Sequence, residues 1–266
     1  MSSMNAYPNF DDATARGPSQ GLWGLAPHNM NQLLDNPSLG HFLWDDFLTF
    51  TSAASGITSD WVGTLVGATP TAVLSPQSDT GYLKGGLLKL STIGTSAGDG
   101  VNLQKPGSAF IAAANTTIIM EVGFKVQTAA TQTSAFIGLG TVDTTCISSG
   151  NALTIGATTT ANHIGFQSLT GDGIYLFGAG KAATATTKTS NTIAAGTVVK
   201  MGFKIKGVTR ADQYINGVLT SPTTPILTAN IPITGLTPTI VIQNFTTVAQ
   251  IAFIDWIRVA QFDGEF

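Results

Sequence analysis

Residues 116–126, TTIIMEVGFKV, decide the fold of this chain. The apolar side chains fall at every second position, and the residues between them on the other side are polar or small. The apolar set is Ile118, Met120, Val122, Phe124 and Val126; the other set is Glu121, Gly123 and Lys125. Successive side chains of a strand point to opposite faces, so this period predicts a β-strand with one buried and one solvated face.

The same alternation recurs towards the C-terminus. Residues 197–206, TVVKMGFKIK, repeat it with lysine or glycine between the apolar positions. Residues 211–219 contain Asn216-Gly217, which is the strongest two-residue signal for a hairpin turn. Residues 250–262, QIAFIDWIRVAQF, are apolar at both sets of positions, which predicts a central strand covered on both sides.

Further strands are predicted wherever short apolar runs are separated by Gly, Pro, Asn or Asp. These are residues 42–50, 61–66, 82–92, 101–104, 134–142, 162–168, 173–178, 181–187 and 238–246. No helical period reaches ten residues after position 41. The pattern predicts an all-β, two-sheet antiparallel jelly-roll sandwich over residues 41–266.

Residues 1–40 differ from the rest because prolines recur through them and no period persists; a single short helical turn fits residues 29–35. We predict an extended N-terminal docking arm that binds a neighbouring subunit. Its expected interface anchors are the large apolar side chains of Leu22, Trp23, Leu25, Tyr7 and Phe10. The alternative is that this segment folds back on its own domain.

The composition favours an assembled protein. Only 10% of residues are charged, against about 25% in an average soluble domain. A chain with few like charges to keep copies apart is expected to have much of its surface covered, although an ordinary Thr-rich sandwich is the alternative. The 12 Lys and Arg form no stripe alternating with aromatic residues, so no nucleic acid is expected as a partner.

Other classes are excluded by single features. The lone Cys146 rules out an internal disulfide framework. The polar N-terminus lacks the apolar region of a signal peptide, and no apolar run approaches 18 residues, so no membrane span is predicted.

Five short stretches occur in an order that resembles the concanavalin-A-like (laminin-G/lectin-type) jelly-roll domains of tailed-phage structural proteins. They are Trp44-Asp45-Asp46-Phe47, residues 98–104 (GDGVNLQ), residues 120–126 (MEVGFKV), Tyr214-Ile215-Asn216-Gly217 and residues 255–259 (DWIRV). The resemblance covers roughly residues 42–262. It implies a two-sheet sandwich and a role in the virion, either as head decoration or as a fibre or tail module.

The carboxylates do not fit a glycosidase of this fold. A retaining mechanism needs two carboxyl groups about 5–5.5 Å apart. The chain has only Glu121 and Glu265, and Glu121 is flanked at alternate positions by Ile119 and Gly123. Residues 94–98 match G-x-S-x-G, but a strand rather than a helix is expected to follow, so we interpret them as a hairpin tip. No catalytic residue is predicted.

No metal or cofactor is predicted either. The three histidines, His28, His41 and His163, lack the spacing of a zinc site. Asp79, Asp99 and Asn102 supply only part of the six to eight oxygens that Ca²⁺ requires, so turn chemistry is the preferred interpretation. Trp61 and Tyr175 are possible sugar platforms, but their apolar neighbours favour a place in the core.

The leading hypothesis is therefore a head decoration (cement) protein that stabilises a capsid by docking on neighbouring subunits. Its partners would be the major capsid protein or other virion proteins, and a homo-oligomer, dimer or trimer, is expected. The chain would be assembled into the virion in the host cytoplasm. The alternative is a carbohydrate-binding adhesin module of a tail or head fibre, with a host glycan as its ligand.

Overall fold

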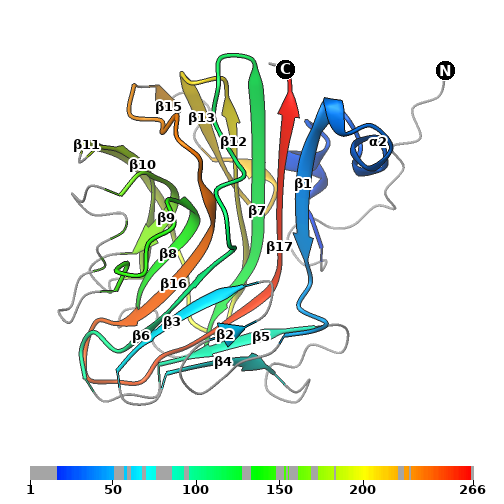
Figure 1. The fold of residues 1–266 in the computed structure, drawn as a ribbon. Helices are drawn as coiled ribbons and strands as arrows, with labels where there is room; N and C mark the ends of the chain where they lie inside the picture. The colour runs from blue at the N-terminus through cyan, green and yellow to red at the C-terminus, as the bar shows by residue number, and fades with distance from the viewer. Residues whose placement is uncertain are drawn as a thin grey trace.

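Two antiparallel sheets pack face to face in the computed structural model (Figure 1). The residues that the structure describes are 17–50, 57–58, 61–67, 70–75, 86–92, 96–127, 133–147, 153, 155, 161–168, 173–182, 184–220, 225–227 and 229–264. Tyr7 and Phe10 lie outside them. Two-sheet packing of this kind confirms the predicted jelly-roll sandwich.

Nine strands form the first sheet, which we call sheet 1. They are β1 (Gly40–Asp45), β4 (Thr71–Leu74), β5 (Leu88–Ser91), β7 (Thr116–Val126), β12 (Val198–Lys206), β13 (Arg210–Ile215), β14 (Val218–Leu219), β15 (Ile226–Leu227) and β17 (Ile251–Asp263). Their order is β14-β13-β12-β7-β17-β5-β4, with β1 paired to β17 and β15 paired to β13. One long side of β17 pairs with β7, and the other side is shared between β1 and β5.

Eight strands form the second sheet, sheet 2. They are β2 (Ile57–Thr58), β3 (Val62–Val66), β6 (Gly100–Gln104), β8 (Thr133–Gly140), β9 (His163–Ser168), β10 (Ile174–Lys181), β11 (Thr184–Thr192) and β16 (Thr237–Asn244). Their order is β11-β10-β9-β8-β16-β6-β3-β2.

The main core lies between the sheets and is built from the alternate apolar positions of the strands. Ring contacts join the two layers: Phe124 of β7 meets Tyr175 of β10 at 5.8 Å between ring centroids, and Phe203 of β12 meets Phe177 at 5.5 Å. Each fully buried large apolar side chain contributes about 1.5–3 kcal/mol. The alternate apolar positions predicted to be buried therefore face the core between the sheets.

Most predicted strands are confirmed, and most of the long ones agree within three residues; the strand predicted over 181–187 is β11, which ends five residues later. The Asn216-Gly217 turn joins β13 to β14, and both residues have positive φ, 50° and 77°. The strand predicted over 42–50 ends at Asp45, and Phe47 has a φ of 51°. The short strands β2, β4 and β15 were not predicted, because segments of two to four residues carry too little periodicity.

The predicted extended arm is instead folded where the structure describes it. Residues 17–39, which we call the strap, contain α1 (Gln20–Trp23), α2 (Met30–Asp35) and the 3-10 helix η1 (Pro37–Leu39). The helical turn predicted for 29–35 is confirmed, and Asn29 starts it with a capping box in which its side chain and that of Gln32 each accept a backbone N–H. Among the described residues, no helix is long and apolar enough to cross a membrane.

Each sheet also has an outer face, and a segment packs on each. The strap lies on the outer face of sheet 1. Residues 141–147 with Leu153 and Ile155, which we call the cover, pack on the outer face of sheet 2 against Phe136 and Val241. The molecule thus has two small apolar clusters outside its main core.

Candidate interaction surface

The strap is seated in a small apolar cluster on the outer face of sheet 1. Leu22 is fully buried, and Trp23 is only 8% exposed. The strap contributes Leu22, Trp23 and Leu33, and the sheet contributes Ile119, Tyr214, Ala260 and Phe262. Figure 1 shows α2 beside β1, so the strap reaches from this edge of the sheet across to β12 and β14, which α1 contacts.

A glycine in β12 makes room for Leu22. A Cβ atom added to Gly202 would lie 2.5 Å from Leu22 Cδ2 and 2.9 Å from the Met120 carbonyl oxygen. Glycine is therefore needed here for close approach of the strap rather than for backbone freedom. The notch over Gly202 fixes the position of α1 along the sheet.

Glu121 of β7 holds the strap through a buried carboxylate. Its Oε2 accepts a hydrogen bond from the Ser19 backbone N–H at 2.8 Å and another from Trp23 Nε1 at 2.9 Å. Its exposed fraction is 0%. Burial raises the pKa of Glu121, while the Ser19 and Trp23 hydrogen bonds and the nearby charge of Lys200 act in the opposite direction.

This burial corrects the expectation of a solvated face on residues 116–126. Ile119, Glu121 and Gly123 alternate with the core residues, as predicted, yet the face that they form is buried too. The strap covers Ile119 and Glu121, and the Trp256 ring lies over Gly123, where an added Cβ would be 2.9 Å from Trp256 Nε1. The alternation was right, but on this strand only Lys125 of the second face is partly exposed.

Arg258 of β17 lies next to Glu121 and joins the strap to the edge strand. It is opposite Glu121 in β7 on one side and opposite Trp44 in β1 on the other. Its guanidinium carbon is 4.2 Å from the centre of the Trp23 ring and 5.0 Å from that of Trp44. Such cation–π contacts are worth about 0.5–2 kcal/mol each, more where water is excluded.

Trp44 continues this stack to the surface. Its ring is nearly parallel to that of Trp256, with 8° between the planes and 6.1 Å between the centroids. It is 41% exposed, while Trp256 is buried. The indole of Trp44 is thus held by its neighbours and is still partly exposed.

The predicted anchors fall into three groups. Leu22 and Trp23 are buried in their own chain, so the alternative in which the segment folds back on its domain describes them, and not the docking on a neighbour. Leu25 is 44% exposed and remains available. Tyr7 and Phe10 lie outside the described residues.

Other exposed apolar side chains accompany Leu25. Leu34 of α2 is 66% exposed, and Val218 of β14 is 64% exposed. Leu34 lies on the strap, and β14 is a strand that α1 contacts. Val218 is opposite Ile215 of the main core, so it lies on the other face of the sheet from the strap. Leu25, Leu34 and the indole of Trp44 form what we call the apolar rim of the strap.

Sequence reasoning missed Glu121, Arg258, Trp44 and Gly202 as parts of one surface. A glutamate inside an otherwise apolar strand is a signal that its face is covered, because an ionisable group tolerates such a place only with bonded partners. Its hydrogen-bond partners, Ser19 and Trp23, lie about 100 positions earlier in the chain, so no local pattern identifies them.

The candidate sugar and calcium residues take structural places. Trp61 is 1% exposed and donates to Asp45 Oδ2 at 2.6 Å, and Tyr175 is fully buried, which confirms their interpretation as core. Asn102 Nδ2 donates to the Asp143 carbonyl oxygen at 2.9 Å, and Asp99 accepts from the Ser96 N–H at 3.3 Å. Asp79 lies outside the described residues.

Within the described part of the chain, no group of three or more His, Cys, Asp or Glu residues is placed to hold a metal ion. Residues 96–98 of the G-x-S-x-G match form a turn that leads into β6, as predicted, and residues 94 and 95 lie outside the described part. A nucleophile elbow would require a helix at this place.

Comparison with known proteins supports the fold. No protein-family model and no curated protein matches the chain. Among solved structures, a protein of unknown function from Shewanella oneidensis MR-1 is 16% identical, with a TM-score of 0.51 over 90% of this chain and 96% of that one.

Peanut lectin in complex with a nonapeptide is 10% identical, with a TM-score of 0.52 over 83% of this chain and 97% of that one. The cellulose-induced protein Cip1 is 11% identical, with a TM-score of 0.52 over 82% and 96%. These likenesses show a lectin-type sandwich, and at such low identity they show the fold alone.

Proposed function

We propose that this chain is a non-enzymatic structural protein of a tailed-phage virion, a head decoration protein that stabilises the capsid by docking on neighbouring subunits. The observation that supports it best is the apolar rim of the strap, Leu25, Leu34 and Trp44, on a chain of which only 10% is charged. Its partners in this proposal are the major capsid protein and other copies of the chain, as a dimer or trimer in the virion.

The mechanism of such a protein is burial of surface. The sandwich is a rigid body, and the strap is fixed to it by Glu121, Arg258 and the notch over Gly202. Each rim side chain that becomes buried contributes about 1.5–3 kcal/mol. Repeated over many symmetry-related copies, such contacts give strong attachment through avidity.

The test is binding to purified heads that lack the chain. Deleting residues 1–40 is a poor variant, because it would strip the strap from Ile119, Ala260 and Phe262 and expose apolar surface. The better variant is Leu25→Ser with Leu34→Ser, which leaves the seat intact. We expect head binding to weaken by at least about tenfold, given the apolar area lost.

The matched control is Ile233→Ser with Val248→Ser, two side chains of similar exposure that lie away from the strap. Equal head binding by the rim variant, the control and the unchanged chain would count against docking through the strap. A separate variant lacking residues 1–16 tests Tyr7 and Phe10 without touching the seat. Sizing each variant by light scattering measures the homo-oligomer.

A second candidate function, a carbohydrate-binding adhesin module, is supported by the exposed indole of Trp44. Sugar-binding proteins use aromatic faces with polar groups nearby, and this one is held in place by Trp256 and Arg258. Glycan-array binding that is lost in Trp44→Ala and kept in Leu48→Ala would support it. An array on which the unchanged chain binds nothing would sink it.

A further inference from the structure

The outer face of sheet 1 gathers most of the positive charge of the chain. Seven of the twelve Lys and Arg residues occupy strand positions that alternate with core residues of this sheet. They are Lys89, Lys125, Lys200, Lys204, Lys206, Arg210 and Arg258. The carboxylates on the same strands and face are Glu121, Asp212 and Asp255, so this face carries +4 while the whole chain carries −3.

This concentration of charge is not visible in the sequence, because the seven residues come from five strands, β5, β7, β12, β13 and β17. Only their register sets them side by side. The absence of a basic stripe in the sequence therefore does not describe the folded surface.

The densest group lies where β12 turns into β13. Lys206 is opposite Arg210, and Lys204 is opposite Asp212. The neighbouring residues Phe203, Ile205 and Ala211 point into the core, which leaves these four on the outer face. Lys204, Lys206 and Arg210 are all half-buried, so the group is fixed by the sheet and still reached by solvent.

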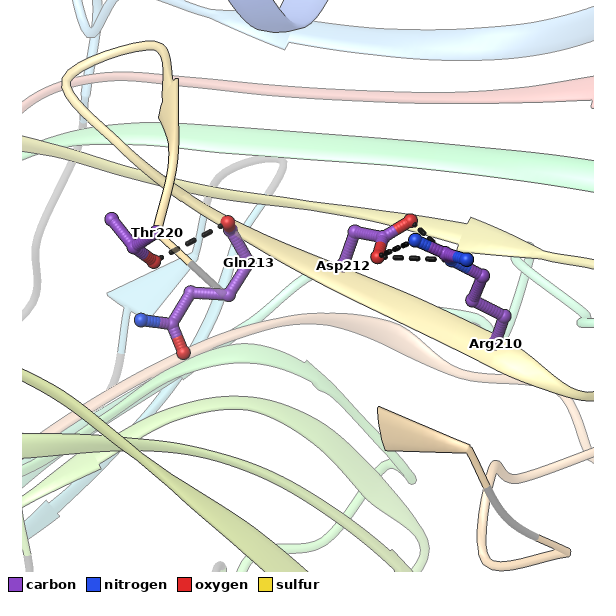
Figure 2. A network of polar contacts seen from close by, with 4 residues as sticks. All are labelled: Arg210, Asp212, Gln213 and Thr220. Atoms are coloured by element: carbon purple, nitrogen blue, oxygen red, sulfur yellow. Dashed lines mark hydrogen bonds and ion pairs between the residues drawn. The ribbon is translucent and has the colours of Figure 1, made fainter. Parts of the chain in front are cut away.

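The carboxylate of this group, Asp212, pairs with only one of the three cations. Figure 2 shows Arg210 folded onto Asp212: Nε donates to Oδ2 at 2.8 Å and to Oδ1 at 3.0 Å, and Nη2 is 2.8 Å from Oδ1. Among the described residues, no carboxylate lies within ion-pair distance of Lys204 or Lys206. Two positive charges are left without a fixed counter-charge.

The cations are close enough to oppose each other. The pKa of Lys204 is lowered, first by partial burial and then by Lys206, with Arg210 acting in the same direction and Asp212 against it. An anion placed between the two lysines would relieve this repulsion. Arg210 would keep its place, because the hydrogen bonds to Asp212 hold its guanidinium.

We propose that Lys204, Lys206 and Arg210 form a binding site for an oxyanion group, a sulfate, phosphate or carboxylate, either free or carried by an acidic polymer. Lysine provides compact point charges that suit an oxyanion of any orientation, and the Arg210–Asp212 pair supplies a rigid border. The strap covers Gly202, which lies between Lys200 and Lys204 on this face, so it separates the site from Lys89 and Lys125. The inference is independent of the role in the virion.

The test is titration of the full-length chain by isothermal calorimetry at low ionic strength, with sodium sulfate, sodium phosphate and dextran sulfate as probes and uncharged dextran as the blank. Lys204→Ser with Lys206→Ser is expected to weaken binding at least about tenfold, since it removes two charged partners. Lys89→Ser with Lys125→Ser is the matched control, because it removes the same charge from the same face.

Asp212→Asn should change the affinity for anions in the opposite direction to the double-lysine variant. Removing the only carboxylate of the group should tighten sulfate binding several-fold, whereas a purely structural cluster would only lose stability. Binding of the inorganic ions identifies a small-oxyanion site, and binding of dextran sulfate alone identifies a polymer site on the same residues. Failure of every anionic probe to bind, or equal losses in the two double-lysine variants, would overturn the proposal.

Discussion

The strap over sheet 1 is fixed by ionisable groups, whereas the cover over sheet 2 is fixed by neutral ones. Under the strap, the carboxylate of Glu121 accepts two hydrogen bonds and the guanidinium of Arg258 lies against Trp23. Under the cover, the side chain of Gln104 donates to the Thr141 carbonyl at 2.9 Å and accepts the Asp143 N–H at 2.8 Å. Both segments bury apolar side chains beside these polar contacts.

The difference teaches what each attachment needs. An amide has a donor and an acceptor, so Gln104 is satisfied by one stretch of backbone. A carboxylate only accepts, so Glu121 needs donors that the strap supplies from Ser19 and Trp23. The strap should therefore be the segment whose attachment depends more on particular residues. Its loss would leave the Glu121 carboxylate without the donors of Ser19 and Trp23.

The largest expected effect is that of Trp23→Ala. It removes a large buried ring, the hydrogen bond from Trp23 Nε1 to Glu121, and the cation–π contact between Trp23 and Arg258. We expect a loss of about 3–5 kcal/mol of unfolding free energy, measured by urea denaturation. Emission from the remaining tryptophans should also show whether the strap has left its seat.

Leu25→Ala is the control for this prediction. Leu25 lies two residues after the end of α1 but is exposed, so its loss should change stability by less than about 0.5 kcal/mol. If the two variants were equally stable, the strap would contribute nothing to the fold and its attachment would be only a surface contact.

The next effect is that of Gly202→Ala, which fills the notch that Leu22 occupies. The new methyl group would lie 2.5 Å from Leu22 Cδ2, and overpacking of this kind costs about 1–3 kcal/mol. Adding Leu22→Ala to Gly202→Ala should restore part of the loss. A double-mutant cycle measures this coupling, and strictly additive effects would show that the two residues do not meet.

The inner half of the sandwich was predictable because it depends on local pattern. Residues 116–126 and 197–206 alternate, and alternation assigns a core face whatever the strand order. The Asn216-Gly217 turn is local in the same sense. These features require no knowledge of which strands are neighbours.

The outer half was not predictable, since it depends on contacts between distant residues. From the local pattern we expected Glu121 to be solvated. The residues that cover its face lie about 100 positions earlier, so the pattern around Glu121 does not reveal them. Trp23 looked like an anchor for another subunit because an apolar segment gives no sign of which chain it will cover. Here the period described the direction of each side chain correctly and left its environment open.

Glu121→Gln is expected to change how stability depends on pH. The pKa of Glu121 is raised in the folded chain, so the folded state binds its proton more readily than the unfolded state does. Its contribution is therefore fully present below the ordinary value of 4.5 and is lost as pH rises through the raised, folded-state pKa. The slope is at most about 1.4 kcal/mol per pH unit.

Urea denaturation at a series of pH values upward from 4.5 measures this. The unfolding free energy of the unchanged chain should fall relative to that of Glu121→Gln, which has no proton to lose. Over the series we expect the difference between the two unfolding free energies to change by about 1–3 kcal/mol. Asp263→Asn, at the exposed end of β17, is the control for the loss of one carboxyl group. A course for Glu121→Gln parallel to that of the unchanged chain would mean that the strap is not held through this carboxyl group.

The smallest effect is expected on sheet 2, where the dependence of stability on pH has the opposite sign to that of Glu121. His163 of β9 is 1% exposed, its Nδ1 lies 3.0 Å from the Ala161 carbonyl oxygen, and its ring edge contacts Phe136. Burial lowers its pKa, and the hydrogen bond to Ala161 acts against this. The stability that it contributes is present above the ordinary value of 6.5 and is lost as pH falls through the lowered pKa.

His163→Gln tests this, with His41→Gln as the exposed control. We expect a change of about 1 kcal/mol in unfolding free energy, which shrinks as the solution is acidified below pH 6.5. Sheet 1 would then be weakened by base and sheet 2 by acid, and two slopes of the same sign would remove the distinction between the two outer faces.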